Sequence, residues 1–375
     1  MTIRDFVDSL NLFDHHCHGI VKGDLTWEMF SSLLTEADAA KPGEELHHQL
    51  GNFTLAVCAQ KLDLEAHTDS TNYWQRRTDL GNEESSERLL TASGISDFAV
   101  DTGYRGDELT TPAELAAMVG KPVQTISRLE SMAEDLILDC DAVNFPDTFR
   151  NQLQAASRNS AGFKSVIAYR FGLDFRPNRP DDTEVVHACQ EWLDRIESTG
   201  STRLNNEVLH RFLLWSAVDI GKPIQIHIGF GDTDITLHRC DPSQMTEFLR
   251  LTEPTGTPIV LLHCYPYVRQ AAILCQIFSH VWMDTSLGVA HAGFASDTTI
   301  RESLEMAPFS RLLFASDAFG LAEIYLAGAW LWRRGMAKAF DPWIAEEAFT
   351  VRNAERIIED IAFRNGAALY QIGGS

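Results

Sequence analysis

The chain has 375 residues and a formal net charge of −22, from 31 basic and 53 acidic side chains. Nucleic-acid phosphates and anionic membrane surfaces repel so acidic a protein, which argues against both as partners. A hydrophobic content of 45% is ample for a packed core, and the length suits one large domain or two ordinary ones.

The cysteines and the N-terminal segment carry a prediction about location. Seven cysteines are scattered along the chain without a CxxC pair, which favours reduced thiols over a disulfide framework. The N-terminus lacks a basic region followed by an apolar one, so no secretion signal is expected. No run approaches the roughly 20 apolar residues of a membrane span. We therefore expect a soluble, cytoplasmic protein.

The first predicted strand ends in a histidine-rich stretch, where residues 14–18 read Asp-His-His-Cys-His. Side chains alternate along a strand, so His16 and His18 share one face and Cys17 points to the other. Neutral imidazoles are suitable ligands for Zn, Fe, Ni or Mn, so His16 and His18 are candidate metal ligands. A structural histidine cluster is the alternative, and partners from later strands would decide between the two.

Residues 24–94 show a polar-rich helical pattern, closed by Gly94 as a C-cap. The stretch is too long for a simple connection. We predict a helical insertion that follows the first strand and covers a site.

From residue 97 onward, short apolar runs alternate with helical patterns. Further strands are predicted at residues 97–101, 122–126, 163–169, 223–228, 258–263, 280–284 and 311–317. Continuously apolar strands separated by helices indicate a parallel sheet buried on both faces. With the first strand, the count of eight favours an α/β fold of the (β/α)8 TIM barrel type over an open sheet. No GxGxxG follows a strand, which weakens a dinucleotide-binding alternative. Residues 1–375 are thus expected to form a single barrel domain that carries the 24–94 insertion.

Potential metal ligands lie at the ends of several predicted strands. Barrel active sites gather at the C-terminal mouth, so these side chains should meet there. The strand-end set comprises His16, His18, His227, His263 and Asp317, and strand four carries Lys164 as a further candidate ligand. A lone histidine at a strand end is more often a hydrogen-bonded core residue, but a set of nitrogen and oxygen donors at one end predicts a metal site.

With these motifs the chain resembles the amidohydrolase superfamily of metal-dependent barrel hydrolases. The resemblance rests on Asp14-x-His16-x-His18, Ile226-His227-Ile228-Gly229, Leu262-His263-Cys264 and Phe314-Ala315-Ser316-Asp317, which follow in the right order over nearly the whole chain. Residues 163–174 and 227–232 resemble the branch also found fused to glutamine-synthetase-like domains. Members of that branch are mostly described only as predicted metal-dependent hydrolases.

The resemblance implies a metal centre. His16, His18 and Asp317 would hold one divalent ion, and His227 and His263 would hold a second or complete the first. Zinc is the first expectation, with manganese, iron or nickel as alternatives.

In one subtype of the superfamily a lysine on strand four is carboxylated and bridges two metals. Lys164 matches that position in strand order, and burial would lower its pKa toward the neutral amine that reacts with carbon dioxide. If strand four runs on to Arg170, however, Lys164 lies deep in the barrel as a structural lysine. Both one ion and two therefore stay open.

The implied activity is hydrolysis by metal-activated water of a C–N bond (amide or cyclic amide) or an ester or lactone bond. Asp317 and His263 would be the catalytic residues, with Asp317 also accepting a proton from the attacking water. Arg170, at the far end of strand four, and Arg128, after strand three, are candidate clamps for a substrate carboxylate. Either arginine could instead pair with nearby acids. The expected substrate is a small, acidic molecule.

Other polar residues beside the motifs receive less specific roles. Asp232 and Asp234 either orient an imidazole or solvate a loop. Packing or structural roles are assigned to His15, His291, Cys17 and Cys264.

Two other classes of function compete. A single-metal decarboxylase or isomerase of an aromatic or sugar acid would use the same scaffold, and an unmodified Lys164 would favour it. A binding module that has lost activity is disfavoured by the complete ligand set. A homo-oligomer is left open.

Overall fold

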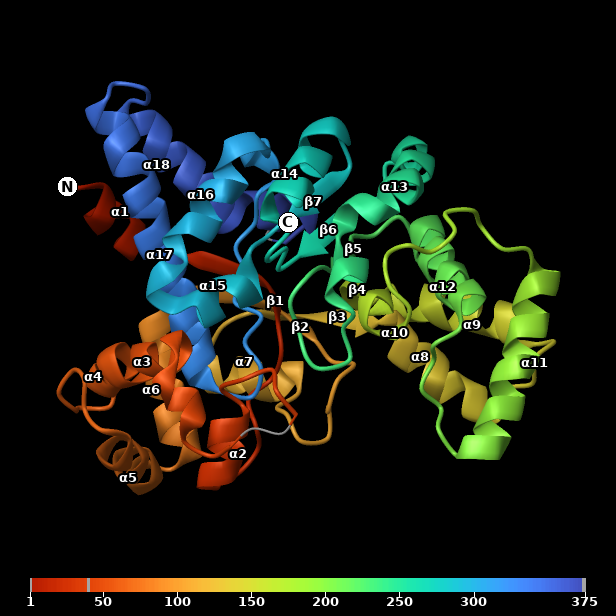
Figure 1. Cartoon of the computed structure of the whole chain (residues 1–375), viewed down its shortest axis with the longest axis horizontal. Coiled ribbons are helices and arrows are strands. Elements are labelled where there is room, and N and C mark those ends of the chain that lie inside the picture. Colours follow the sequence, from red (N-terminus) through yellow and green to blue (C-terminus); the bar gives the residue numbers. More distant parts are fainter. Residues whose placement is uncertain (1, 39–40, 373–375) are drawn as a thin grey trace.

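The computed structural model describes residues 2–38 and 41–372 (Figure 1). Its centre is a sheet of parallel strands in which each strand pairs with the next along the chain. The strands are β1 (Leu12–Cys17), β2 (Ile95–Asp101), β3 (Val123–Arg128), β4 (Ser160–Ser165), β5 (Ile224–His227), β6 (Ile259–Leu262) and β7 (Val281–Met283). The sheet curls, which confirms the predicted α/β barrel class.

The eighth strand, predicted at residues 311–317, is present only as an irregular segment. Leu313 N donates to the Met283 carbonyl at 3.0 Å, and Asp317 N donates to the His16 carbonyl at 3.0 Å. The segment therefore bonds to both β7 and β1 and bridges the gap between the two edges of the sheet. Near the end of the segment the Asp14 carboxylate accepts the Ser316 N–H at 2.9 Å, and Asp317 adopts a left-handed backbone conformation, with φ of 52°.

Helices precede, connect and follow the strands and cover the barrel (Figure 1). They are α1 (Ile3–Ser9), α7 (Pro112–Val119), α8 (Leu129–Leu136), α9 (Phe145–Ala156), α10 (Ile167–Arg170), α11 (Asp182–Thr199), α12 (Glu207–Ile220), α13 (Thr246–Thr252), α14 (Val268–Ile277), α15 (Ser286–Ala292), α16 (Asp297–Met306), α17 (Ala322–Ala345), α18 (Val351–Glu359) and α19 (Asn365–Leu369). Helix α7 begins at Pro112, where Thr111 and Glu114 form a reciprocal capping box.

Between β1 and β2 the chain is mainly helical. The helices there are α2 (Trp27–Ser32), α3 (Gln49–Phe53), α4 (Ala59–Lys61), α5 (Ser70–Leu80) and α6 (Asn82–Ser93). Figure 1 shows them gathered on one side of the molecule, next to α17. A buried ion pair joins the two parts, because Arg77 Nε lies 2.8 Å from Glu323 Oε1. Gly94 ends α6 with φ of 66°, as predicted.

Strand four is shorter than predicted, and this corrects its expected course over residues 163–169. The chain leaves the sheet after Ser165 and turns into α10. The buried Glu130 carboxylate accepts from Ser165 Oγ at 2.7 Å and from Val166 N at 3.0 Å. With its N–H engaged in this way, Val166 cannot continue the ladder. Lys164 is consequently near the mouth of the barrel and not deep inside it.

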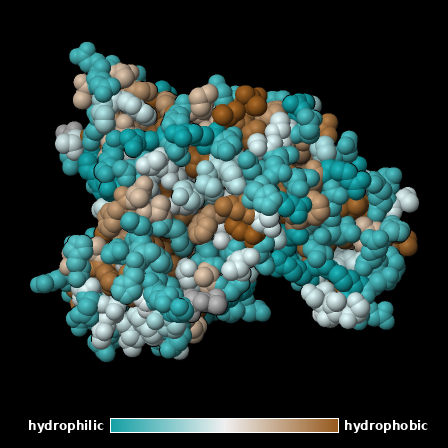
Figure 2. All heavy atoms as spheres, viewed as in Figure 1, coloured by the Kyte–Doolittle hydropathy of each residue, from teal (hydrophilic) through white to brown (hydrophobic). Residues whose placement is uncertain are grey.

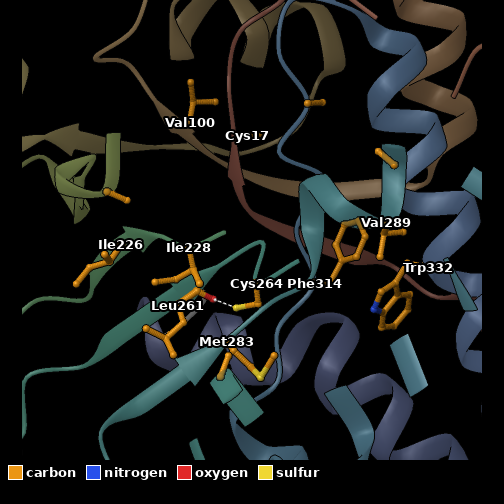
Figure 3. Packing of buried hydrophobic residues seen from close by; sticks show 14 of the residues in the cluster. Cys17, Val100, Ile226, Ile228, Leu261, Cys264, Met283, Val289, Phe314 and Trp332 are labelled. Carbon is orange, nitrogen blue, oxygen red and sulfur yellow. Dashed lines mark hydrogen bonds between the residues drawn. The ribbon is translucent and has the colours of Figure 1, made fainter. Parts of the chain in front are cut away.

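The packing around the strands is apolar and includes the cysteines beside the motifs. Figure 3 shows Cys17 and Cys264 among Val100, Leu261 and Met283. Cys264 Sγ donates to the Leu261 carbonyl at 3.3 Å, and both cysteines are fully buried packing residues, as expected.

The molecule has a mainly polar surface on the face shown in Figure 2, and its thiols are free. The face seen in Figure 2 is mostly hydrophilic, with its hydrophobic residues in small separate patches. All seven cysteines are unpaired. Among the described residues, no helix has the length and apolar character needed to cross a bilayer.

Candidate metal centre

A cavity of about 400 Å³ opens at the C-terminal ends of the strands. Its wall brings together every residue predicted as a ligand or a substrate clamp. These are His16, His18, Lys164, His227, His263, Asp317, Arg128 and Arg170. The predicted convergence of these side chains at one mouth is thus present in the structure.

Three imidazoles surround the carboxylate of Asp317. His16 Nε2 lies 3.0 Å from Asp317 Oδ1, and His18 Nε2 lies 3.6 Å from the same oxygen. His263 Nδ1 is 3.4 Å from Asp317 Oδ2. The three histidines are buried, while the Asp317 side chain keeps 11% of its surface open to the cavity.

The backbone at two of these residues is held in an uncommon conformation. His263 and Asp317 have φ of 67° and 52°, a left-handed region that few residues other than glycine occupy. Asp284, at the end of β7, supports His263 by accepting its backbone N–H at 2.9 Å. Ser286 Oγ lies 2.7 Å from His263 Nδ1. No role was assigned to Asp284 from the sequence, although it is the last residue of a predicted strand.

The chemistry of these donors fits a divalent cation. The Asp101 carbonyl can only accept, so His18 Nδ1, 3.2 Å away, must carry a proton, and in the neutral imidazole the lone pair is then on Nε2, the atom that faces Asp317. His227 Nε2 is buried and has no hydrogen-bond partner within the described ranges. The donor atoms of His16, His263 and Asp317 all lie within 4.8 Å of one another. A divalent cation between the imidazole lone pairs and the carboxylate would offset the repulsion among these acceptors.

The electrostatics keep these groups in the forms that bind metal. Burial, with the Lys164 charge nearby, lowers the pKa of His16 to about 3, and burial lowers the pKa of His263 to about 4. Both imidazoles are therefore neutral at pH 7, as metal ligation requires. Burial by itself would raise the pKa of Asp317. In acid, protonated imidazoles beside its carboxylate outweigh that effect and hold the pKa of Asp317 well below the ordinary range, so the carboxylate is anionic at pH 7.

Lys164 reaches the same cavity. Its side chain is buried, and its ammonium group makes no hydrogen bond or ion pair with any described residue. Burial lowers the pKa of Lys164 to about 8, against the opposing pull of Asp317 and Asp101. Its place near the mouth, and its lack of a partner, are compatible with the predicted carboxylation, which stays a prediction.

The two predicted substrate clamps, Arg128 and Arg170, differ in the number of hydrogen bonds that they make to acidic side chains. Arg128 donates from Nε and Nη2 to Asp101 Oδ2, at 3.1 and 2.5 Å, and is buried. Arg170 donates from Nη1 to Glu134 Oε1 at 3.2 Å. Each arginine therefore has an acidic partner, and each also lines the cavity.

Other residues of the cavity wall were not found by sequence reasoning. Arg203 and Glu36 come from connections, and His291 comes from α15. His291 was assigned to packing, yet it lines the cavity with Nε2 3.5 Å from Glu36 Oε1. No strand end marks these positions, so only the tertiary structure brings them to the site.

The two aspartates after β5 also line the cavity. Asp234 pairs with Arg203 at 2.7 Å, and Asp232 accepts the Asp234 N–H at 2.9 Å. Neither bonds to an imidazole in the part of the chain that the structure describes. These contacts therefore favour the predicted role in the loop over the orientation of an imidazole.

The chain is thus a parallel barrel with imidazole and carboxylate donors at its mouth. The profile of the amidohydrolase family matches residues 146–359, more than half of the sequence. The chain belongs to the amidohydrolase family.

Individual relatives agree with this assignment. The crystal structure of a provisionally named metal-dependent hydrolase from Lactobacillus casei ATCC 334 superposes with a TM-score of 0.87 and 28% identity, over 99% of this chain and 97% of that one. A uronate isomerase from Bacillus halodurans C-125 has a TM-score of 0.68 over 98% and 95% of the two chains, at 15% identity, and shares the fold.

One curated relative is similar over part of its length. Protein FluG of Emericella nidulans is 29% identical over 225 residues, which are 56% of this chain and 25% of that protein. The matched part thus spans about a quarter of FluG.

Proposed function

We propose that this protein is a metal-dependent hydrolase that cleaves an amide, cyclic amide, ester or lactone bond of a small acidic molecule. The observation that carries the proposal is the convergence of three imidazoles on the Asp317 carboxylate at the floor of an open cavity. A cytoplasmic location, supported by the unpaired cysteines, is part of the same proposal.

The residues that would hold the ion are His16, His18, His227, His263 and Asp317, with Lys164 as a bridge if a second ion is present. Zinc, or else manganese, iron or nickel, would act there as a Lewis acid that activates water and polarises the scissile carbonyl. His16, His18 and His263 already surround the Asp317 carboxylate, and the proposal adds His227 and Lys164 from the same cavity wall.

Asp317 is the proposed proton carrier. Its low pKa keeps the carboxylate anionic at neutral pH, so it can accept a proton. As the water oxygen bonds to the substrate carbonyl carbon, the water proton passes to Asp317. Asp317 then returns that proton to the leaving nitrogen or oxygen as the C–N or C–O bond breaks. His263 orients the carboxylate through its 3.4 Å contact with Oδ2.

The arginines are proposed to select the substrate. Arg170 uses only Nη1 in its contact with Glu134, which leaves its other N–H groups without a partner among the described residues. Those donors can form a bidentate pair with a carboxylate. Arg128 already donates from Nε and Nη2 to Asp101, and we assign to it mainly a contribution of positive potential to the same wall.

The test is elemental analysis of the purified protein, followed by assays on amides, lactones and esters after loading with Zn²⁺ or Mn²⁺. We expect one or two equivalents of a divalent metal and hydrolysis of an acidic member of the panel. A chelator should abolish turnover, and added metal should restore it. Full activity in a metal-free preparation would sink the proposal.

A one-metal decarboxylase or isomerase is the second candidate. It is favoured by a single compact group of three donor side chains among the described residues. Carbon-13 NMR of protein equilibrated with labelled bicarbonate separates the two candidates. A carbamate signal that disappears in Lys164→Met, together with two bound ions in the wild type, would favour the hydrolase. A missing signal with one bound ion, and turnover of aromatic or sugar acids in the same panel, would favour the second candidate.

A further inference from the structure

Gln225 lies directly beneath the proposed ligands. It is fully buried in β5, and it shares a face of that strand with His227 because side chains two residues apart point the same way. Its Nε2 donates to the His15 carbonyl at 2.8 Å and to the Tyr370 hydroxyl at 2.9 Å. Its Oε1 lies 2.8 Å from His16 Nδ1.

These contacts determine which way the amide faces. A backbone carbonyl has no hydrogen to donate, so the atom next to the His15 oxygen must be the NH₂ group of Gln225. Rotating the amide by half a turn would set two oxygens against each other. Oε1 therefore faces His16, and because Oε1 can only accept, His16 Nδ1 must carry the proton. The lone pair of His16 is then on Nε2, the atom 3.0 Å from Asp317.

We infer that Gln225 is a positioning residue that holds His16 in the one tautomer able to bind a metal, and that Tyr370 completes this support. The inference rests on the metal site in the proposed function. It assigns a role to two residues that carry no ligand atom themselves.

Without Gln225, the metal-free site would favour the other tautomer. A proton on His16 Nε2 could be donated straight to Asp317 Oδ1 and would remove the repulsion between two acceptors. An incoming cation would then have to displace that proton. Because Gln225 Oε1 accepts the proton of His16 Nδ1, the lone pair on His16 Nε2 stays available for the ion.

The network continues to the opposite side of the site. Because the Tyr370 oxygen accepts from Gln225, its own hydrogen can point at His15 Nδ1, 3.1 Å away. With Nδ1 accepting from Tyr370, the ring proton of His15 is on Nε2, which faces Asp284 Oδ2 at 3.0 Å. Asp284 Oδ1 accepts the backbone N–H of His263. One buried chain of groups thus reaches two proposed ligands, and it gives His15 the structural role expected from the sequence.

The experiment combines histidine tautomers with metal affinity in the full-length protein. Nitrogen-15 NMR of histidine-labelled protein, with and without Zn²⁺, should show His16 protonated on Nδ1 in the wild type. Loss of one set of signals in His16→Asn provides the assignment. Gln225→Met, which removes both hydrogen-bonding ends at similar volume, should shift His16 toward the tautomer protonated on Nε2 and lower Zn²⁺ affinity about 10- to 100-fold by chelator competition.

Tyr370→Phe keeps the ring and its edge-on packing on Phe13 while removing only the hydroxyl. We expect it to weaken Zn²⁺ binding roughly 10-fold, and it serves if Gln225→Met does not fold. The matched control is Tyr73→Phe, another fully buried tyrosine whose hydroxyl bonds to Glu323 in the helical region. Its Zn²⁺ affinity should equal that of the wild type.

Each outcome decides something different. His16 protonated on Nε2 in metal-free wild type would overturn the inference, as would wild-type affinity in both Gln225→Met and Tyr370→Phe. Failure of the wild-type chain itself to bind Zn²⁺, Mn²⁺, Fe²⁺ or Ni²⁺ would instead count against the proposed function. In that case the tautomer measured by NMR still tests what Gln225 does to His16.

Discussion

The Asp317 carboxylate is proposed both to bind the metal and to carry a proton. A neutral amide in its place could do this only in part. The carboxylate faces two imidazole nitrogens through Oδ1 and a third through Oδ2. An asparagine has the same shape and could even donate to a bare imidazole nitrogen, so the fold should tolerate it. It cannot accept a proton from water, however, and it is a poorer ligand than a carboxylate.

We therefore expect Asp317→Asn to keep a wild-type circular dichroism spectrum and to lose at least about 100-fold in turnover, the usual contribution of a positioned proton carrier. Asp79→Asn, at an exposed position of α5, is the matched control and should retain full turnover. Wild-type rates in Asp317→Asn would remove this residue from the chemistry.

At the level of residues, the sequence reveals a site where side chains follow strand ends. His16, His227 and His263 could be placed together because parallel strands bring their carboxyl ends to one mouth. Arg203 and His291 carry no such mark, since one lies in a connection and the other in a helix. The contacts of Gln225 are equally hidden, because a buried glutamine looks like any other strand residue until its partners are known.

Among the elements, β4 shows why a strand's end can be missed. Residues 166–169 are apolar or aromatic and would suit a strand, yet the chain turns into α10. The cause is the Glu130 side chain from α8, which takes the Ser165 hydroxyl and the Val166 N–H. A contact between elements has overridden local preference, and pattern alone could not contain it. The turn matters because it leaves Lys164 at the cavity.

Glu130→Leu should therefore destabilise the fold. It would leave the Ser165 hydroxyl and the Val166 N–H buried without an acceptor, at a cost of about 1–3 kcal/mol for each group. Glu130→Gln retains an acceptor oxygen and should lose less. Urea unfolding of the two variants gives the comparison. Equal stability of Glu130→Leu and the wild type would mean that another contact ends β4.

At the scale of the whole molecule, we propose that residues 1–375 fold as one domain in which the helical region 24–94 is docked on the barrel. Arg77 of α5 and Glu323 of α17 form a buried pair, and the Tyr73 hydroxyl donates to the same carboxylate at 2.9 Å. Removing one partner of a buried pair leaves a charge without compensation.

We expect Arg77→Met to lower the free energy of unfolding by about 3–5 kcal/mol, while the wild type unfolds in one transition by both tryptophan fluorescence and circular dichroism. Arg77→Met combined with Glu323→Leu removes both charges and should recover part of that loss. A separate early transition in the wild type would show that the helical region is an independent unit.

The proposed ligands also give the metal a role in stability, because they come from distant parts of the chain. His16 lies in β1, His227 in β5, His263 after β6 and Asp317 in the closing segment. An ion shared by these residues would tie the barrel's two edges together and would bind only the folded state. Zn²⁺ at 100 times its dissociation constant should then raise the free energy of unfolding by about 2.7 kcal/mol. Thermal unfolding with and without Zn²⁺ measures this shift, which should vanish in a His16→Asn, Asp317→Asn double variant. A shift that persists there would place the stabilising ion elsewhere in the molecule.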